Sequence, residues 1–273
     1  MKKRFAFSAF ALAGLLAACG STDDGGSTNG SGGSESSEEL TLLEQIQEEG
    51  VIKVGTEGTY APFTFHDESD TLTGYDVEVM NEVAERMGVE VEYMETQWDS
   101  MFEGLNSERF DVIANQVGIR EDRLAEYDFS IPYTLSSAVV VVPEENSAVS
   151  SFEDLEGLQS AQSLTSNYAD IATEYGAELV QVEGLAQAIE LIKTGRAEVT
   201  VNDKLAILDF QKQQPDAGIK IAAEEGDVAE SAFMFRKGNE ELVEEFNKHL
   251  EEMQEDGTLT EISEKWFGED VSQ

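Results

Sequence analysis

Residues that commonly build catalytic and metal sites are scarce in this 273-residue chain, which has one cysteine and two histidines. The cysteine is residue 19, so the chain after it can form neither an internal disulfide bond nor a thiolate nucleophile. His66 lies in a polar run and His249 in an acidic helical pattern, and neither has neighbours at metal-ligand spacing. A nucleophile elbow and a phosphate-binding glycine loop are also missing. The sequence therefore predicts no metal, no cofactor and no catalytic residues.

Positive charge is equally scarce. The chain has 17 lysine and arginine residues against 57 aspartate and glutamate residues, for a formal net charge of −40 at pH 7. Nucleic acid is disfavoured as a partner because its binding needs a basic surface. The acidic residues are spread along the chain rather than gathered in one tail, which indicates a strongly solvated surface. Adaptation to high salt, where screening shortens charge repulsion, is one hypothesis for this acidity.

Long apolar runs are missing except at the N-terminus. Basic residues at positions 2–4 precede an apolar run from Phe5 to about Leu16, which is too short for an ordinary transmembrane helix. Small residues follow, and this order is typical of a secretory signal. The segment Leu16-Ala17-Ala18-Cys19 resembles the lipobox of bacterial lipoproteins. The resemblance implies that residues 1–18 are a signal peptide, and that lipidated Cys19 anchors the exported protein to the outer face of the cell membrane.

A polar segment separates this N-terminus from the rest of the chain. Residues 20–39 are Gly, Ser, Thr, Asp, Asn and Glu only, a composition that cannot bury a core. We therefore predict a flexible linker over 19–39. The remaining residues, 40–273, are long enough for one large domain or two small ones.

Strand and helix patterns alternate through residues 40–273. The first series has strand candidates at 51–54, 89–93 and 111–114, with helices at 76–87 and 98–105. A β-branched run at 136–142 precedes a second series, with strands at 158–162, 179–182 and 197–201 and helices at 167–175, 186–193 and 204–212. A strand at 231–235 and two helical patterns end the chain. This alternation predicts an α/β fold in two lobes, each with a mainly parallel sheet flanked by helices.

Polar or aromatic residues follow several predicted strands, where open α/β sheets bind ligands. The candidate ligand-binding residues are Glu57, Tyr60, Trp98, Asn115, Gln116, Gly118, Arg123, Gln162, Thr165, Ser166, Asn167 and Asp203. Arg123 offers a planar fork for a carboxylate, and Gly118 allows close approach of the backbone. Asp203 offers a partner for an ammonium. The combination is that of a site for a free, zwitterionic α-amino acid.

Each of these segments has a simpler alternative when taken alone. Trp98 at a helix start can be a buried core residue, and Arg123 can belong to a surface helix of mixed charge. Thr165, Ser166, Asn167 and Asp203 can be helix N-caps. Capping and ligand binding are compatible at the same residue, so the sequence leaves both roles open.

Several motifs, in order along the chain, resemble those of the polar amino-acid-binding proteins of bacterial ABC importers, solute-binding family 3. They are Gly-Thr-x-Gly-x-Tyr-x-Pro-Phe (55–63), Leu-Thr-Gly-Tyr-Asp-Val-Glu (72–78), Arg-Phe-Asp-Val-Ile-Ala (109–114), Tyr-Asp-Phe-Ser-x-Pro-Tyr (127–133), Phe-Glu-Asp-Leu (152–155) and Lys-Trp-Phe-Gly (265–268). The resemblance implies a two-lobe periplasmic-binding-protein-like fold of type II that closes over its ligand. Lobe 1 would contain residues 40–136 and 236–273, and lobe 2 residues 137–235.

Segments 114–119, 161–167 and 201–203 resemble the cystine-binding branch of that family. The resemblance implies that Arg123 and the backbone N–H groups of Gly118 and Ser166 hold the α-carboxylate. Asp203 and the carbonyl of Asn115 or Gln116 would hold the α-ammonium. Tyr60 and Trp98 would sandwich the ligand, and further pocket-lining residues would be Glu57, Gln162 and Asn167.

The family pattern is broken at Arg120 and Glu121, where the family usually has Thr or Lys and then Pro, so Arg120 could compete for the carboxylate. The resemblance implies a monomeric lipoprotein that delivers an amino acid to an ABC permease. L-cystine is the first candidate ligand, with cysteine or glutamine as alternatives. A further alternative is an exported enzyme resembling cyclohexadienyl dehydratase, in which Glu57 would transfer a proton.

Overall fold

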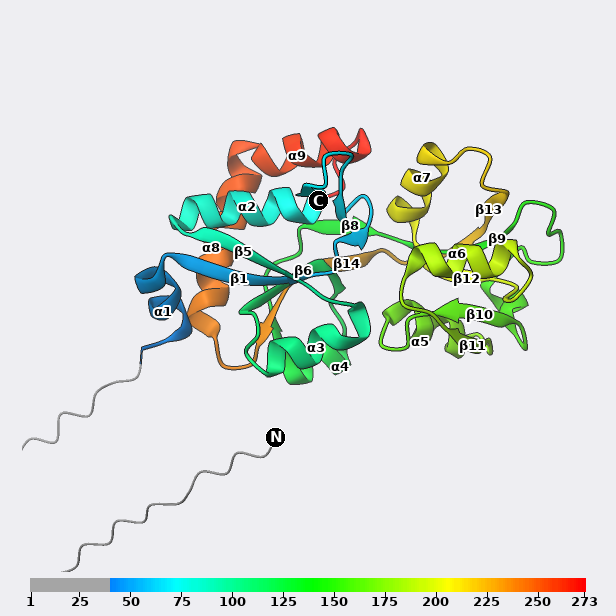
Figure 1. Ribbon diagram of the computed structural model, residues 1–273, viewed down its shortest axis with the longest axis horizontal. Helices are drawn as coiled ribbons and strands as arrows, with labels where there is room; N and C mark the ends of the chain where they lie inside the picture. The colour runs from blue at the N-terminus through cyan, green and yellow to red at the C-terminus, as the bar shows by residue number, and fades with distance from the viewer. Residues whose placement is uncertain (1–39) are drawn as a thin grey trace, which may run out of the picture. The chain divides into compact units, whose positions relative to one another are not determined.

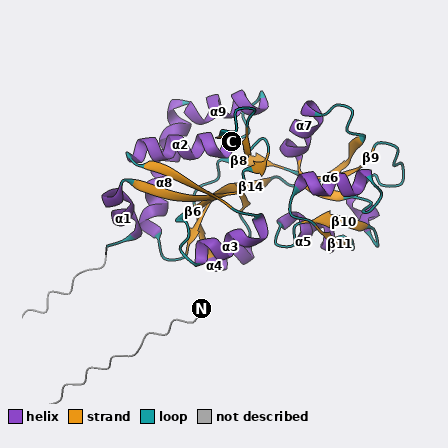
Figure 2. Ribbon diagram, viewed as in Figure 1, coloured by secondary structure: helices purple, strands orange, loops and turns teal. Residues whose placement is uncertain are grey.

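The computed structural model describes residues 40–273, so the predicted signal peptide (1–18) and lipidated linker (19–39) lie outside the described residues. Within the described part, no helix combines the length and apolar character required to span a membrane. Helices pack around two groups of strands, coloured by position along the chain in Figure 1 and by type in Figure 2. We call these two groups, with their helices, the first and second lobes.

The first lobe is built on a six-stranded sheet within the described residues. The strand order is β5 (Glu90–Glu95), β1 (Val51–Thr56), β6 (Val112–Gly118), β14 (Ala229–Arg236) and β7 (Tyr127–Phe129), and β8 (Thr134–Ser136) also pairs with β14. β1 runs parallel to β5 and β6, whereas β14 is antiparallel to its partners. A small antiparallel sheet follows β1 and contains β2 (Thr59–Tyr60), β3 (Thr64–His66) and β4 (Leu72–Thr73). The carboxyl ends of β1 and β6 therefore lie at one edge of the main sheet.

Helices cover both faces of this sheet (Figure 1). They are α1 (Leu42–Glu49), α2 (Tyr75–Met87), α3 (Trp98–Asn106), α4 (Glu121–Glu126), α8 (Glu240–Asp256) and α9 (Thr258–Phe267). Val112 and Ala114 of β6 belong to the core that includes α2, α8 and α9, while Ile113 and Val117 belong to the core with α3. Successive side chains of a strand point to opposite faces, and both faces of β6 are buried in a core. The position of β6, including its carboxyl end, is therefore fixed by packing on both sides.

The second lobe contains two small sheets. β12 (Thr200–Asp203), β9 (Ala138–Pro143) and β13 (Ile219–Glu224) are antiparallel, and β10 (Gln159–Gln162) is parallel to β11 (Glu178–Gln181). A parallel bridge from Ser160 to Val199 connects β10 to the segment before β12. The helical elements are η1 (Phe152–Leu155), α5 (Asn167–Glu174), α6 (Leu185–Lys193) and α7 (Lys204–Gln213).

The predicted α/β class with two lobes is confirmed, and the sheets are mixed rather than mainly parallel. One boundary differs from the prediction. Residues 231–235 were expected to close the second lobe, but they lie in β14 and pair with β6 in the first. Phe233 and Phe235 pack into one core and Met234 into the other, so this strand is apolar on both faces. Such a strand needs the covered centre of a large sheet, and the chain accordingly returns to the first lobe at Ala229.

The start of α2 depends on Gly74, whose φ of 135° is open to glycine but rarely adopted by other residues. The backbone N–H groups of Tyr75 and Asp76 donate to the carbonyls of Pro62 and Phe63, at 2.9 and 3.0 Å. A Cβ atom at Gly74 would overlap the carbonyl of Phe63. Gly74 thus lets the first turn of α2 lie against the loop after β2, close to the edge where β1 and β6 end.

We predict that Gly74→Ala lowers the free energy of unfolding by more than about 3 kcal/mol, because it adds a backbone overlap to an unfavourable φ. The matched control is Gly88→Ala at the other end of α2. Gly88 also has a positive φ, of 76°, but a Cβ there meets nothing within 4 Å. The control should cost only about 1 kcal/mol. Urea denaturation followed by circular dichroism measures both; equal losses would contradict this account.

Candidate functional site

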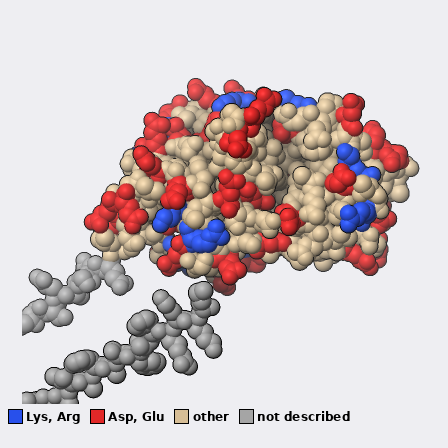
Figure 3. All heavy atoms as spheres, viewed as in Figure 1, with Lys and Arg blue, Asp and Glu red and all other residues tan. Residues whose placement is uncertain are grey.

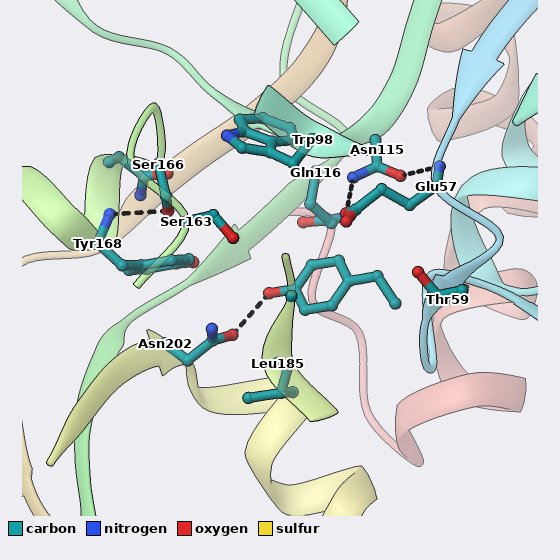
Figure 4. A pocket seen from close by; sticks show the side chains of 13 residues that line it. Glu57, Thr59, Trp98, Asn115, Gln116, Ser163, Ser166, Tyr168, Leu185 and Asn202 are labelled. Carbon is teal, nitrogen blue, oxygen red and sulfur yellow. Dashed lines mark hydrogen bonds between the residues drawn. The ribbon is translucent and has the colours of Figure 1, made fainter. Parts of the chain in front are cut away.

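A cavity lies where the two lobes face each other, and the empty space of about 470 Å³ between its walls includes space open to solvent. Its lining residues are Glu57, Thr59, Tyr60, Trp98, Asn115, Gln116, Ser163, Ser166, Asn167, Tyr168, Gly184, Leu185 and Asn202. Figure 4 shows these side chains converging from both lobes.

Seven of the predicted residues line this cavity: Glu57, Tyr60, Trp98, Asn115, Gln116, Ser166 and Asn167. The other five predicted residues are not in its lining: Gly118, Arg123, Gln162, Thr165 and Asp203. Gln162 has a structural role, because its side-chain amide donates to Val201 O at 3.1 Å within the second lobe. Arg123 and Asp203 are buried next to lining residues, as described below.

Arg123 from α4 lies between the lobes and is only 6% exposed. Its Nη1 donates to the carbonyl of Gly118 at 3.0 Å, and its Nη2 donates to the carbonyl of Thr165 in the second lobe at 3.2 Å. The guanidinium carbon is 5.6 Å from the ring centre of Trp98. Burial lowers the pKa of Arg123 to about 10, and the nearby Arg120 adds to that effect, so the group is charged at neutral pH.

No carboxylate within residues 40–273 lies within 4 Å of that guanidinium. Carbonyl dipoles and an aromatic face compensate a buried cation only partly. The guanidinium therefore favours an anion next to it, near the cavity but outside its lining, and a carboxylate matches its geometry.

Asp203 is 3% exposed and caps α7. Its Oδ1 accepts hydrogen bonds from the backbone N–H of Leu205 and Ala206 and from Ser136 Oγ, and its Oδ2 accepts one from Tyr168 OH at 3.1 Å. The N-cap alternative is thus confirmed for this residue. Burial raises its pKa, and the hydrogen bonds oppose that rise.

Tyr168 connects Asp203 to the cavity, since its ring lines the space while its hydroxyl donates to the carboxylate. Its pKa is raised well above the usual value, first by burial and then by the charge of Asp203. It therefore keeps its proton, and Asp203 acts on the cavity partly through this phenol.

The segment before α5 is held by its own caps and by the first lobe. Ser166 Oγ accepts from the N–H of Tyr168, which confirms its N-cap role, and the Ser166 N–H donates to Ser163 O at 3.1 Å. Thr165 donates from its N–H and Oγ1 to Asp99 Oδ1 of α3, at 3.1 and 2.8 Å. Thr165 thus joins the lobes at the rim.

Two further contacts join the lobes around the cavity. Tyr60 OH donates to Asn202 Oδ1 at 2.8 Å, as drawn in Figure 4, and Arg120 forms an ion pair with Asp170 at 2.7 Å. Because Arg120 pairs with Asp170 and Asp122, it does not compete with Arg123 for a ligand. Together with Thr165, these contacts describe a closed arrangement of the lobes.

Sequence reasoning missed six lining residues: Thr59, Ser163, Tyr168, Gly184, Leu185 and Asn202. Gly184 and Leu185 start α6 directly after β11, so the strand-end rule used elsewhere could have found them. Asn202 lies near the end of β12, directly before Asp203, which caps α7. The same strand-end rule could therefore have identified it.

Glu57, directly after β1, and Asn115, in the middle of β6, form a reciprocal pair. Asn115 Nδ2 donates to Glu57 Oε2 at 2.7 Å, and the Glu57 N–H donates to Asn115 Oδ1 at 2.8 Å. The other carboxyl oxygen faces Gly184 of the second lobe. Burial raises the pKa of Glu57 to about 7, and the bond from Asn115 limits the rise. The wall of the cavity thus includes the acidic side chain of Glu57.

We predict that Glu57→Gln changes the pH dependence of stability. Folding raises the pKa of this carboxyl from 4.5 to about 7, so its stabilising contribution is complete below pH 4.5 and is lost as the pH rises through 7. Between pH 4.5 and 8, the unfolding free energy of the unmodified protein should fall relative to Glu57→Gln, by up to about 3 kcal/mol. Urea denaturation at several pH values tests this. Parallel curves for the unmodified protein and Glu57→Gln would refute the prediction.

A family model described as bacterial extracellular solute-binding proteins, family 3, matches residues 52–269. The L-cystine-binding protein TcyA of Bacillus subtilis (strain 168) is 54% identical over 258 residues, which cover 94% of this chain and 94% of that protein. These similarities extend over the strands and helices that build the cavity.

Solved structures show similarity in three dimensions. The L-cystine solute receptor of Neisseria gonorrhoeae, in an unliganded open conformation, is 49% identical, with 86% of this chain and 100% of that chain covered and a TM-score of 0.58. An ancestral arginine-binding protein bound to arginine is 36% identical, with 80% and 98% covered and a TM-score of 0.75. The lower score against the open receptor, despite its higher identity, agrees with the interlobe contacts described above.

Proposed function

This chain belongs to the bacterial extracellular solute-binding proteins of family 3, and on that premise we propose that it captures L-cystine between its lobes and delivers it to an ABC permease. The proposal depends mainly on the environment of Arg123. This buried cation contacts both lobes and has no carboxylate partner among residues 40–273. A ligand carboxylate at its fork would supply the missing charge. The bond between ligand and Arg123 would then favour the closed arrangement over the open one.

The acidic groups at the cavity support the zwitterionic part of the proposal. Glu57 lies on the first-lobe wall and the Tyr168–Asp203 pair on the second-lobe wall, and both offer hydrogen-bond acceptors to an ammonium in the cavity. Trp98 and Tyr60 supply apolar faces between the two polar sides. Among amino acids, cystine is favoured because the TcyA relative is an L-cystine-binding protein and the Neisseria gonorrhoeae protein is an L-cystine solute receptor; cysteine and glutamine are the alternatives.

The proposal also covers how the N-terminus anchors the protein and where the chain crosses between the two lobes. A signal peptide of residues 1–18, lipidated Cys19 and a linker to residue 39 would anchor the protein at the outer face of the cell membrane, as the segment 16–19 favours. The chain would cross between lobes after β8 and again before β14. A monomer suffices, since residues of one chain supply both sides of the cavity.

We predict that Arg123→Ala weakens L-cystine binding by about 2–5 kcal/mol, because a buried carboxylate would lose its cation. Isothermal titration calorimetry should show a smaller loss for Arg123→Lys, which keeps the charge without the planar fork. Arg86→Ala is the control, since Arg86 pairs with Glu82 and Asp256 away from the cavity. A panel of cystine, cysteine and glutamine with the unmodified protein identifies the ligand. Unchanged affinity in Arg123→Ala would exclude this carboxylate site.

The proposed binding function assigns no catalytic residue. The second candidate function is that of an exported dehydratase with the same fold. Glu57 favours it, since a carboxyl with a pKa near 7 suits proton transfer. We expect no turnover when the purified protein is incubated with prephenate or arogenate and the products are followed by chromatography. Turnover that Glu57→Gln abolishes would establish the enzyme instead.

A further inference from the structure

Gln116 has an unusual backbone for a residue inside a strand. Its φ is +50°, in the left-handed region, and its partners in β14 shift register at this point: Val117 pairs with Ala232, but Ile113 pairs with Met234. The strand therefore carries extra residues here, and such bulges re-aim side chains. Left-handed backbone is unfavourable for a glutamine unless the surroundings hold it.

Asp76, in the first turn of α2, supplies that restraint. Its side chain is fully buried, and its Oδ2 accepts the backbone N–H of Gln116 at 2.7 Å. Its Oδ1 accepts the side-chain Nε2 of the same residue, also at 2.7 Å. One carboxylate thus binds both the main chain and the side chain of Gln116. The position of Asp76 depends in turn on the bond from its own N–H to Phe63 O.

These bonds orient the amide of Gln116. Nε2 has two hydrogens; one is donated to Asp76 and the other to Thr134 Oγ1 at 2.9 Å. The amide oxygen must then point the other way. Oε1 is buried and has no hydrogen-bond donor among the described residues. Gln116 is only 8% exposed, and it is one of the residues that line the cavity. Figure 4 shows this oxygen directed toward the middle of the cavity, close to Glu57.

A buried amide oxygen without a donor is unfavourable, and a ligand N–H can remove that cost. The proposed ligand brings an ammonium with three donors. We propose that Gln116 Oε1 accepts a hydrogen bond from the ligand ammonium and that Asp76 is the positioning residue that aims it, an inference that rests on the amino-acid-binding function proposed above. Asp76 itself does not touch the ligand, because it is fully buried and is not part of the cavity lining.

The test is Asp76→Asn, which replaces one acceptor oxygen by an NH₂ donor. A donor facing Gln116 Nε2 is unfavourable, so the glutamine amide should turn and present Nε2 to the cavity. The ligand ammonium would then face a donor. In calorimetry with L-cystine we expect affinity to fall about 10–100-fold, while Glu78→Gln, in the same turn of α2 but paired with Lys265, should leave it within about twofold.

A double variant separates positioning from a general structural effect. In Asp76→Asn with Gln116→Glu, the new NH₂ can donate to one oxygen of the introduced carboxylate, and the other oxygen again faces the cavity as an acceptor. Affinity should recover at least tenfold relative to Asp76→Asn alone. Loss of packing around α2 would not be repaired by this second change, so absence of recovery would overturn the role of Asp76.

Folding is checked by circular dichroism for each variant. If Asp76→Asn does not fold, Gln116→Met keeps the side-chain length but removes Oε1 and should weaken cystine binding at least fivefold. Unchanged affinity in folded Asp76→Asn or Gln116→Met would overturn the inference. If the unmodified protein binds neither cystine, cysteine nor glutamine, the proposed function fails instead. Binding by the unmodified protein with no effect of the variants refutes only the role of Asp76 and Gln116.

Discussion

The arrangement of the site depends on the burial of one positive charge between the lobes. Arg123 donates to Gly118 in the first lobe and to Thr165 in the second, and carbonyl oxygens alone do not compensate a guanidinium removed from water. An anion at its fork would improve its electrostatic environment, and the attraction is stronger when the lobes exclude water from around the pair. Under the proposed function, the charge of Arg123 would couple the occupant of the cavity to the relative position of the lobes.

The direct contacts between lobes are too weak to determine closure alone. The Arg120–Asp170 pair has side chains 30% and 60% exposed, and exposed pairs of this kind contribute about 0–1 kcal/mol. Tyr60–Asn202 and Thr165–Asp99 add neutral or partly exposed hydrogen bonds. Opening and closing can then remain reversible, since the bound molecule supplies the difference between the two states.

Two acidic side chains lie near the cavity, one at its wall and one behind the wall. Glu57 lies at the wall, and Asp76 lies behind Gln116, where burial raises its pKa to about 7 as well. The exposed acidic side chains seen in Figure 3 are solvated and numerous over the face shown. Buried and exposed carboxylates thus have different functions: those near the cavity define a preference for a cation, whereas those at the surface keep the molecule strongly hydrated.

Much of the fold followed from local patterns. The helical spacing at 76–87 agrees with α2, and the alternation of strands with helices indicated the α/β class, because periodicity reports which faces a segment buries. The strand at 231–235 was recognised but assigned to the wrong lobe. Its apolar residues on both faces indicated a central strand, yet the identity of its neighbours is a long-range property that this pattern does not contain.

The sequence by itself determined which residue types are available for the site: one arginine for a carboxylate, strand-end acids, and aromatic walls. The tertiary structure alone decided how they are used. It showed Asp203 capping α7 and acting through Tyr168, Arg120 paired with Asp170, and Gln116 held by an aspartate 40 residues away. Hydrogen bonds between distant segments depend on the relative placement of strands and helices, and local sequence patterns do not encode that placement.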